Sequence, residues 1–190
     1  MQCMKTEVIN IIETELTQTF DELFRWFNID KELLNYAPNS KGWSIRKILE
    51  HISLTNHYLL MLISKGTRKA LERSRKENYA EMLVDYDLDW QRMKIIGEHN
   101  SFVWNRPGHM EPRGKMRVAD IQHELESQLQ QCRILLNKMP HGEGALYKIM
   151  MSVNNLGKID VYHYIYFLVQ HAKRHITQME HVETEFHIGV

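Results

Sequence analysis

Cysteine is scarce in this chain of 190 residues, and neither sign of charge is in excess. The two cysteines, Cys3 and Cys132, cannot build a disulfide framework, so a reducing compartment is the simplest expectation. The 24 lysines and arginines equal the 24 aspartates and glutamates in number. This balance gives the protein no general attraction to nucleic acid or to an anionic membrane, and we expect neither as a partner.

Long apolar runs are also missing. The longest, Tyr58 to Ile63, is far shorter than the ~20 residues that cross a bilayer. Glu13 and Glu15 interrupt any signal-peptide core near the N-terminus. The hydrophobic content of 43% is nevertheless ordinary for a globular chain. These features predict a single cytoplasmic domain over residues 1–190.

Strand-like alternation does not persist beyond a few residues, whereas apolar residues recur at three- and four-residue steps along most of the chain. These stripes predict four long helices, near residues 6–27, 44–64, 118–139 and 159–186. Ser44 and Asp160 occupy N-cap positions, and Gly66 is expected to end the second helix. Residues 65–117 form a long connection in which we expect one or two short helices. The prediction is therefore an all-α fold, a four-helix bundle with a long crossover between its second and third helices.

Histidine is the one residue type in unusual supply, with eleven copies. His171 and His175 are four residues apart in the last predicted helix, so their side chains lie ~40° apart on one face. Phe167 and Leu168 share that face, so both imidazoles are expected to point into the bundle. A shared metal ion would satisfy their buried nitrogens, and two hydrogen-bonded core histidines are the alternative.

A third metal ligand has to come from another helix. His51 is the best candidate, although it lies at the flank of the apolar stripe of its helix and not at the centre. The remaining histidines are expected on the surface, in loops or in structural roles: His57, His99, His109, His123, His141, His163, His181 and His187.

Three stretches of the chain stand out together: GWSIRKILEHI at Gly42–Ile52, EPRGKM at Glu111–Met116 and FLVQHAKRHITQ at Phe167–Gln178. In this order they resemble the opening motif, a segment just before the third helix, and the closing motif of the DinB/YfiT-like superfamily of bacterial metalloproteins. The resemblance spans the chain, and it implies a four-helix bundle with one divalent metal ion held by three histidines. Carried over residue by residue, the implied ligands are His51, His171 and His175.

Three histidines with an open coordination position suit a catalytic rather than a structural metal, and imidazole ligands favour zinc or nickel. The resemblance further implies a homodimer and an enzyme of the thiol-dependent S-transferase type. In such an enzyme a metal-activated low-molecular-weight thiol attacks an electrophilic small-molecule substrate. Two alternatives stay open: a metal-dependent hydrolase, and a non-enzymatic metal-binding or interaction protein.

Few other residues point to chemistry. No Asp or Glu lies on the histidine face of the last helix, so no general base for hydrolysis is evident. Gln178, one turn after His175, could orient a ligand or could be a capped core glutamine. The basic patch from Lys65 to Lys76 could hold an anionic thiol cofactor, and a solvated helix face is the alternative.

Overall fold

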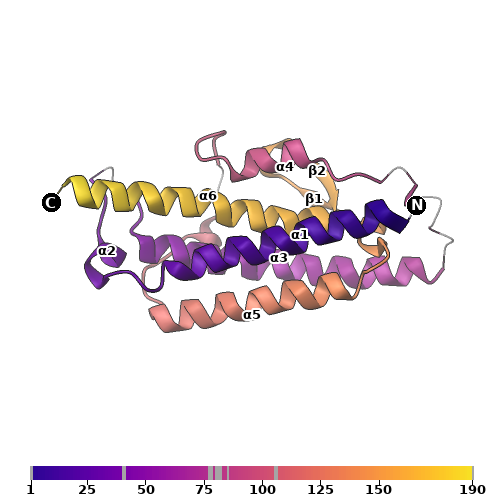
Figure 1. Cartoon of the computed structure of the whole chain (residues 1–190), viewed down its shortest axis with the longest axis horizontal. Coiled ribbons are helices and arrows are strands. Elements are labelled where there is room, and N and C mark those ends of the chain that lie inside the picture. Colours follow the sequence, from indigo (N-terminus) through magenta and orange to yellow (C-terminus); the bar gives the residue numbers. More distant parts are fainter. Residues whose placement is uncertain are drawn as a thin grey trace.

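Four long helices lie side by side along the long axis of the protein (Figure 1). The computed structural model describes residues 2–39, 42–76, 79, 83–84, 86–104 and 107–189. Of residues 2–6 only the backbone is described, so the side chain of Cys3 lies outside the described residues. The long helices are α1 (Gln2–Arg25), α3 (Ile45–Ser74), α5 (Val118–Asn137) and α6 (Val161–Ile188).

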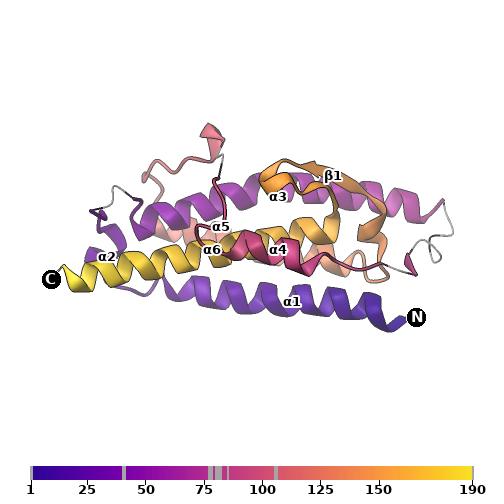
Figure 2. The ribbon, with the colours of Figure 1, turned by 90° about the horizontal axis from the view of Figure 1, so that it is seen from above.

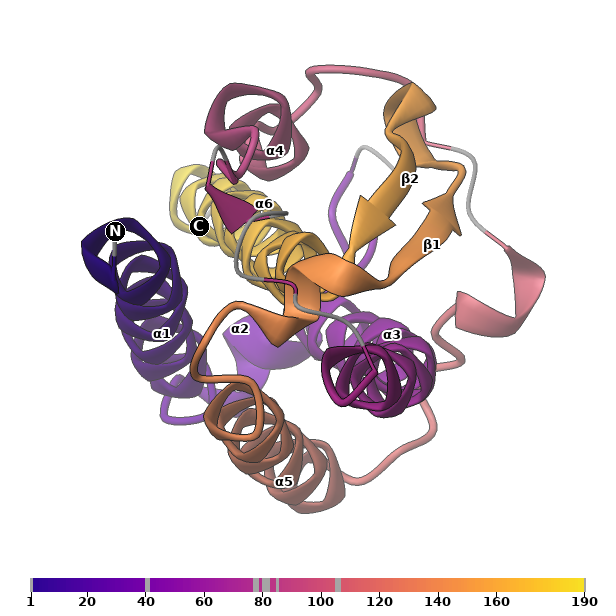
Figure 3. The same ribbon diagram turned by 90° about the vertical axis from the view of Figure 1, so that its right-hand side faces the viewer.

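The arrangement of these helices confirms the predicted all-α bundle. Seen end-on, α1, α6, α3 and α5 occupy its four corners (Figure 3). Helix α6 packs against α1 and α3, and α5 packs against the same two helices. Helices α3 and α5 run in the same direction, so the chain has to return along the bundle between them (Figure 1). This return is the predicted crossover.

Short elements cover one side of the bundle. The crossover contains α4 (Trp90–Gly97) and the 3-10 turn η2 (Gly108–Met110), as its length requires. Helix α4 packs along α6, and strand β1 lies over α3 (Figure 2). The other short elements are α2 (Lys31–Asn35), η3 (Glu143–Leu146), β1 (Lys148–Met151), η4 (Val153–Asn155) and β2 (Gly157–Asp160).

The β-hairpin before α6 is a feature that the periodicity does not predict. Strand β1 pairs antiparallel with β2, with Met151 opposite Gly157. Asn154, Asn155 and Gly157 turn the chain with φ of 45°, 53° and 73°, a region that asparagine and glycine tolerate best. Two strands of four residues are too short to give a recognisable alternation. The last helix consequently begins at Val161, and residues 159 and 160 belong to β2.

Both predicted N-caps are confirmed. The Ser44 side chain accepts a hydrogen bond from the backbone N–H of Lys47 at 3.4 Å, at the start of α3. The Asp160 carboxylate accepts one from the backbone N–H of His163 at 3.0 Å, at the start of α6. Each acceptor satisfies a donor that the first turn of a helix leaves without an intrahelical partner.

The predicted helix end at Gly66 is wrong, because α3 continues for two more turns to Ser74. Gly66 instead marks a close approach between elements. A Cβ atom at this position would lie 2.9 Å from Cδ1 of Ile149 in β1 and 3.0 Å from Cγ2 of Val161 in α6. The missing side chain therefore lets the hairpin and the start of α6 pack against α3, and it does not end the helix.

The core of the bundle is built from the predicted apolar stripes. In α1, the side chains of Ile12, Leu16, Phe20 and Leu23 are fully buried, each four or three residues from the next. Burying one such side chain stabilises a fold by about 1.5–3 kcal/mol, so the stripe as a whole holds α1 against its neighbours.

Across the described residues, no helix is both long enough and apolar enough to cross a membrane.

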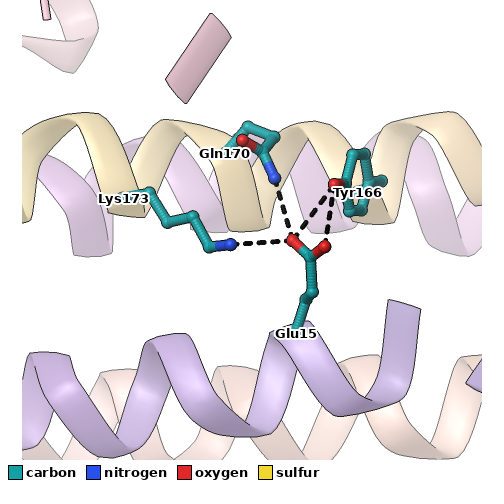
Figure 4. Close-up of polar contacts among 4 residues, drawn as sticks. All are labelled: Glu15, Tyr166, Gln170 and Lys173. Atoms are coloured by element: carbon teal, nitrogen blue, oxygen red, sulfur yellow. Dashed lines mark hydrogen bonds and ion pairs between the residues drawn. The ribbon is translucent and has the colours of Figure 1, made fainter. Parts of the chain in front are cut away.

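A polar cluster fixes the rotation of α6 against α1 (Figure 4). The Glu15 carboxylate of α1 accepts hydrogen bonds from the Tyr166 hydroxyl at 3.0 Å and from Nε2 of Gln170 at 3.1 Å. It also pairs with Nζ of Lys173 at 2.8 Å. Since these three residues follow one face of α6 at helical spacing, the adjacent face of α6 is turned toward α3 and the crossover. That adjacent face carries His171.

Candidate metal centre

Three histidines from two helices meet beneath the crossover. His51 comes from α3, and His171 and His175 come from α6. One ligand nitrogen from each lies within 4.8 Å of the other two, and the three side chains are only 4%, 2% and 8% exposed. The structure thus brings together the three residues that the sequence predicted as metal ligands. Among the described residues, no other group of histidine, cysteine or acidic side chains meets in this way.

Two of the imidazoles are held by hydrogen bonds at Nδ1. Nδ1 of His51 lies 2.8 Å from the carbonyl oxygen of Met110, and Nδ1 of His175 lies 2.8 Å from Oε1 of Gln178. Because a carbonyl oxygen can only accept, each Nδ1 carries the proton and each Nε2 carries the lone pair. Fixing the outer nitrogen in this way is the usual means by which proteins orient metal-binding histidines.

The inner nitrogens of the cluster fit a cation. Nε2 of His171 lies 3.2 Å from Nε2 of His175. Two lone pairs at that separation repel each other unless a proton or a metal ion lies between them. Burial, reinforced by the neighbouring imidazoles and Arg174, lowers the pKa of His171 well below its ordinary value. Burial, together with His51, Arg174 and His99 and against the opposing effect of the Gln178 hydrogen bond, lowers the pKa of His175 to about 3. Both rings are therefore neutral at physiological pH, and neutral imidazole is the form that binds metals.

The loop that follows η2 is docked on α3 beside His51. The buried Glu50 carboxylate accepts hydrogen bonds from the backbone N–H of Gly114 at 2.7 Å and of Arg113 at 3.3 Å. One turn earlier, Arg46 donates to the carbonyl oxygen of Met116 at 2.7 Å. These contacts hold the segment that carries the Met110 carbonyl, the acceptor for His51. The EPRGKM stretch therefore positions a candidate ligand, and Glu50 is a residue whose part the sequence did not reveal.

A cavity of about 520 Å³ opens beside the three imidazoles. Its walls come from α3, α6, the hairpin and the crossover, and they are mainly aromatic, aliphatic and methionine side chains, including Trp43, Leu59, Trp104, Met150, Val153 and Phe167. The volume lies within the range of small-molecule sites. No Asp or Glu is found among the described residues that line it.

Arg174 supplies a positive charge to the cavity wall. Its guanidinium lies over the Trp104 ring, 4.8 Å from the ring centroid, and donates a hydrogen bond to the Glu98 carbonyl oxygen at 2.8 Å. Partial burial lowers the pKa of Arg174 from its ordinary value, but a guanidinium stays protonated in proteins.

The comparison with known families agrees with this geometry. The family model described as the DinB superfamily matches residues 15–179, which include all three histidines. The chain belongs to the DinB superfamily. No curated protein and no solved structure matches it. Family membership supports the bundle fold, and together with the three converging histidines it fits a metal-binding DinB protein.

The other histidines of this DinB protein that the structure describes are not members of the cluster. His163 contacts the Asp160 carboxylate at 2.9 Å, close to the start of α6. His99 was expected in solvent, but it lines the cavity and packs against His181 with ring centroids 5.1 Å apart. The turn after α4, where Asn100 has a φ of 61°, folds this part of the crossover back over α6. No sequence signal marked that contact.

The structure also places Gln178 and the basic patch from Lys65 to Lys76, for which the sequence left two interpretations open. Oε1 of Gln178 accepts a hydrogen bond from Nδ1 of His175, so Gln178 orients a candidate metal ligand. The basic patch lies mostly in the last turns of α3, and none of its members lines the cavity. Lys65 is separated from His51 by roughly 20 Å of helix. Lys69 pairs with Glu72 at 2.8 Å, which suits a solvated helix face.

Proposed function

We propose that this protein is a metal-dependent enzyme of the thiol S-transferase type, with His51, His171 and His175 as its metal ligands. The observation that carries the proposal is a cluster of three buried imidazoles on the wall of a mainly apolar cavity. A divalent ion bound there, zinc or nickel by its ligand type, supplies a Lewis acid that lowers the pKa of a coordinating thiol.

The chain's own residues prepare this site for the reaction. Met110 and Gln178 hold two imidazoles in the tautomer that presents Nε2. The aromatic and methionine walls surround a bound thiol and its acceptor with apolar surface, which strengthens electrostatic interactions inside the cavity. The proposed step forms a carbon–sulfur bond. The thiol gives its proton to solvent, the sulfur attacks an electrophilic carbon, and the leaving group departs with the electrons of the broken bond.

A metal-dependent hydrolase is the second candidate, and the cavity lining argues against it. Hydrolysis by a metal site commonly uses a carboxylate to accept a proton from water. Such a group is missing from the described lining of this cavity. A thiol with a lowered pKa needs no such base, so the lining favours S-transfer.

The test is a panel of low-molecular-weight thiols and electrophilic acceptors, measured by loss of free thiol. We expect consumption of one thiol in the panel that stops on treatment with a chelator and returns with zinc or nickel. His51→Ala should lack this activity, whereas His57→Ala, an exposed histidine of the same helix, should keep it. Cleavage of esters or amides without thiol would support the hydrolase. Metal binding with neither activity would support a non-enzymatic protein.

The proposal also covers the cellular location, the domain organisation and the oligomeric state of the protein. A cytoplasmic location is supported by the buried, unbridged thiol of Cys132, and a single domain over residues 1–190 is supported by the one hydrophobic core that the described helices share. A homodimer through helix faces also belongs to the proposal and rests on the family resemblance, with the exposed side chains of Met61 on α3 and Ile134 on α5, 60% and 54% accessible, as apolar contacts available to it. Light scattering that finds only monomer at micromolar concentration would contradict the dimer.

A further inference from the structure

Arg174 is a half-buried cation without an acidic partner among the described residues. Its guanidinium contacts the Glu98 carbonyl and the faces of Trp104 and Phe102, at 4.8 and 5.9 Å from the ring centroids. Adjacent Lys173 is different, because it points to α1 and pairs with the Glu15 carboxylate at 2.8 Å. A guanidinium offers five N–H donors in a planar fork, and the single bond to Glu98 leaves most of them for another acceptor.

The cavity that Arg174 lines has an excess of positive charge. The three histidines are neutral when they bind a metal, so a divalent ion there keeps its full double charge. Arg174 adds one positive charge to the two of the ion. The described residues of the lining include no carboxylate that could balance the charge of the ion or that of Arg174. Uncompensated charge in a partly buried site is costly, and an anionic ligand removes that cost.

The path from the histidines to Arg174 runs across aromatic surface. The Trp104 ring contacts both sides, 5.7 Å from the His171 ring and 4.8 Å from the Arg174 guanidinium. Phe167 stacks on His171 with ring centroids 6.3 Å apart. A ligand that reaches from the imidazoles to Arg174 therefore needs an apolar body that packs on Trp104 and an anionic end.

We propose that the cavity binds an aromatic carboxylate and that Arg174 is the residue that recognises its carboxylate. Arginine binds carboxylates through two parallel N–H···O bonds, which selects for a planar anion. The inference deepens the proposed function and rests on it in one respect: the carboxylate is assigned to the acceptor substrate of the S-transfer reaction. Arg174 is then a specificity-determining residue.

Binding can be measured without turnover, by calorimetric titration of naphthylacetate and of its neutral isostere naphthylacetamide. We expect wild-type protein to bind the carboxylate at least tenfold more tightly than the amide, both as purified and after treatment with a chelator. Arg174→Met should abolish this preference and leave the amide affinity unchanged, which also shows that the cavity is intact. Lys173→Met is the matched control, and it should keep the preference. Arg174→Gln, which can still donate to Glu98, provides the same test if the methionine variant does not fold.

Two results would overturn the inference. One is a carboxylate preference in Arg174→Met or Arg174→Gln equal to that of the wild type. The other is loss of the wild-type preference on chelation, because the metal and not Arg174 would then recognise the carboxylate. Both readouts are binding affinities and do not depend on thiol transfer. If the protein prefers the carboxylate over the amide but has no S-transferase activity, the proposed reaction is refuted and the role of Arg174 is not.

Discussion

Replacing Glu50 with alanine tests whether the loop after η2 positions the candidate metal centre. In the native structure the Glu50 carboxylate is 3% exposed and accepts backbone N–H groups from Gly114 and Arg113. Arg113 is exposed, so its N–H can turn to water, whereas the Gly114 N–H loses its short 2.7 Å bond outright. A hydrogen bond to a charged group contributes about 1.5–3 kcal/mol, and we expect Glu50→Ala to lower the free energy of unfolding by that amount.

The same substitution should weaken metal binding. Once the loop is released, the Met110 carbonyl no longer fixes Nδ1 of His51 at 2.8 Å. Loss of such an outer hydrogen bond typically lowers metal affinity 10–100-fold. Urea denaturation measures the first effect, and competition with a chromophoric chelator measures the second. Glu124→Ala removes an exposed carboxylate from α5, and it should change stability by less than about 0.5 kcal/mol. If Glu50→Ala loses stability but keeps wild-type metal affinity, the positioning role of the loop is refuted.

Two further predictions concern the histidines themselves. The metal-free protein should lose stability as pH falls from about 6.5 toward 3, because His175 takes up a proton at its ordinary pKa when unfolded but only near a pKa of about 3 when folded. The slope of the unfolding free energy is at most about 1.4 kcal/mol per pH unit for each such histidine, and urea denaturation of chelator-treated protein should show a smaller slope in His175→Ala. Gln178→Leu removes the acceptor of His175 and should lower metal affinity about tenfold at unchanged helix content, whereas Thr177→Val should not. Equal affinities in the chelator competition would contradict the assigned role of Gln178.

The sequence predicted the three members of the histidine cluster by different routes. The spacing of His171 and His175 predicted that both are buried side by side, because both lie within the apolar stripe of one helix. His51 lies at the flank of its stripe, and only the family resemblance favoured it. In the fold it is 4% exposed, since the crossover and hairpin form an additional layer over α3 and α6. Helical periodicity describes burial against other bundle helices and does not register that layer.

The features that escaped prediction depend on contacts between distant segments. Gly66 meets Ile149 of the hairpin, Glu50 meets Gly114 of the crossover, and His99 meets His181 near the end of α6. Each residue looks ordinary within its own stretch of sequence. A glycine after a helical stripe usually ends the helix, and a histidine in an irregular segment is usually solvated. In the fold, the helix continues past Gly66 to Ser74, and His99 packs against His181 in the cavity wall.

The metal content of His51→Ala tests the central claim most directly. Elemental analysis after extensive dialysis should find one divalent ion per chain in the wild type and none in His51→Ala, with the helical circular dichroism spectrum preserved. The control variants His57→Ala and His123→Ala replace exposed histidines of α3 and α5, and both should keep the ion. If His51→Ala retains wild-type metal content, or if a control variant loses it, the cluster of His51, His171 and His175 is not the metal centre.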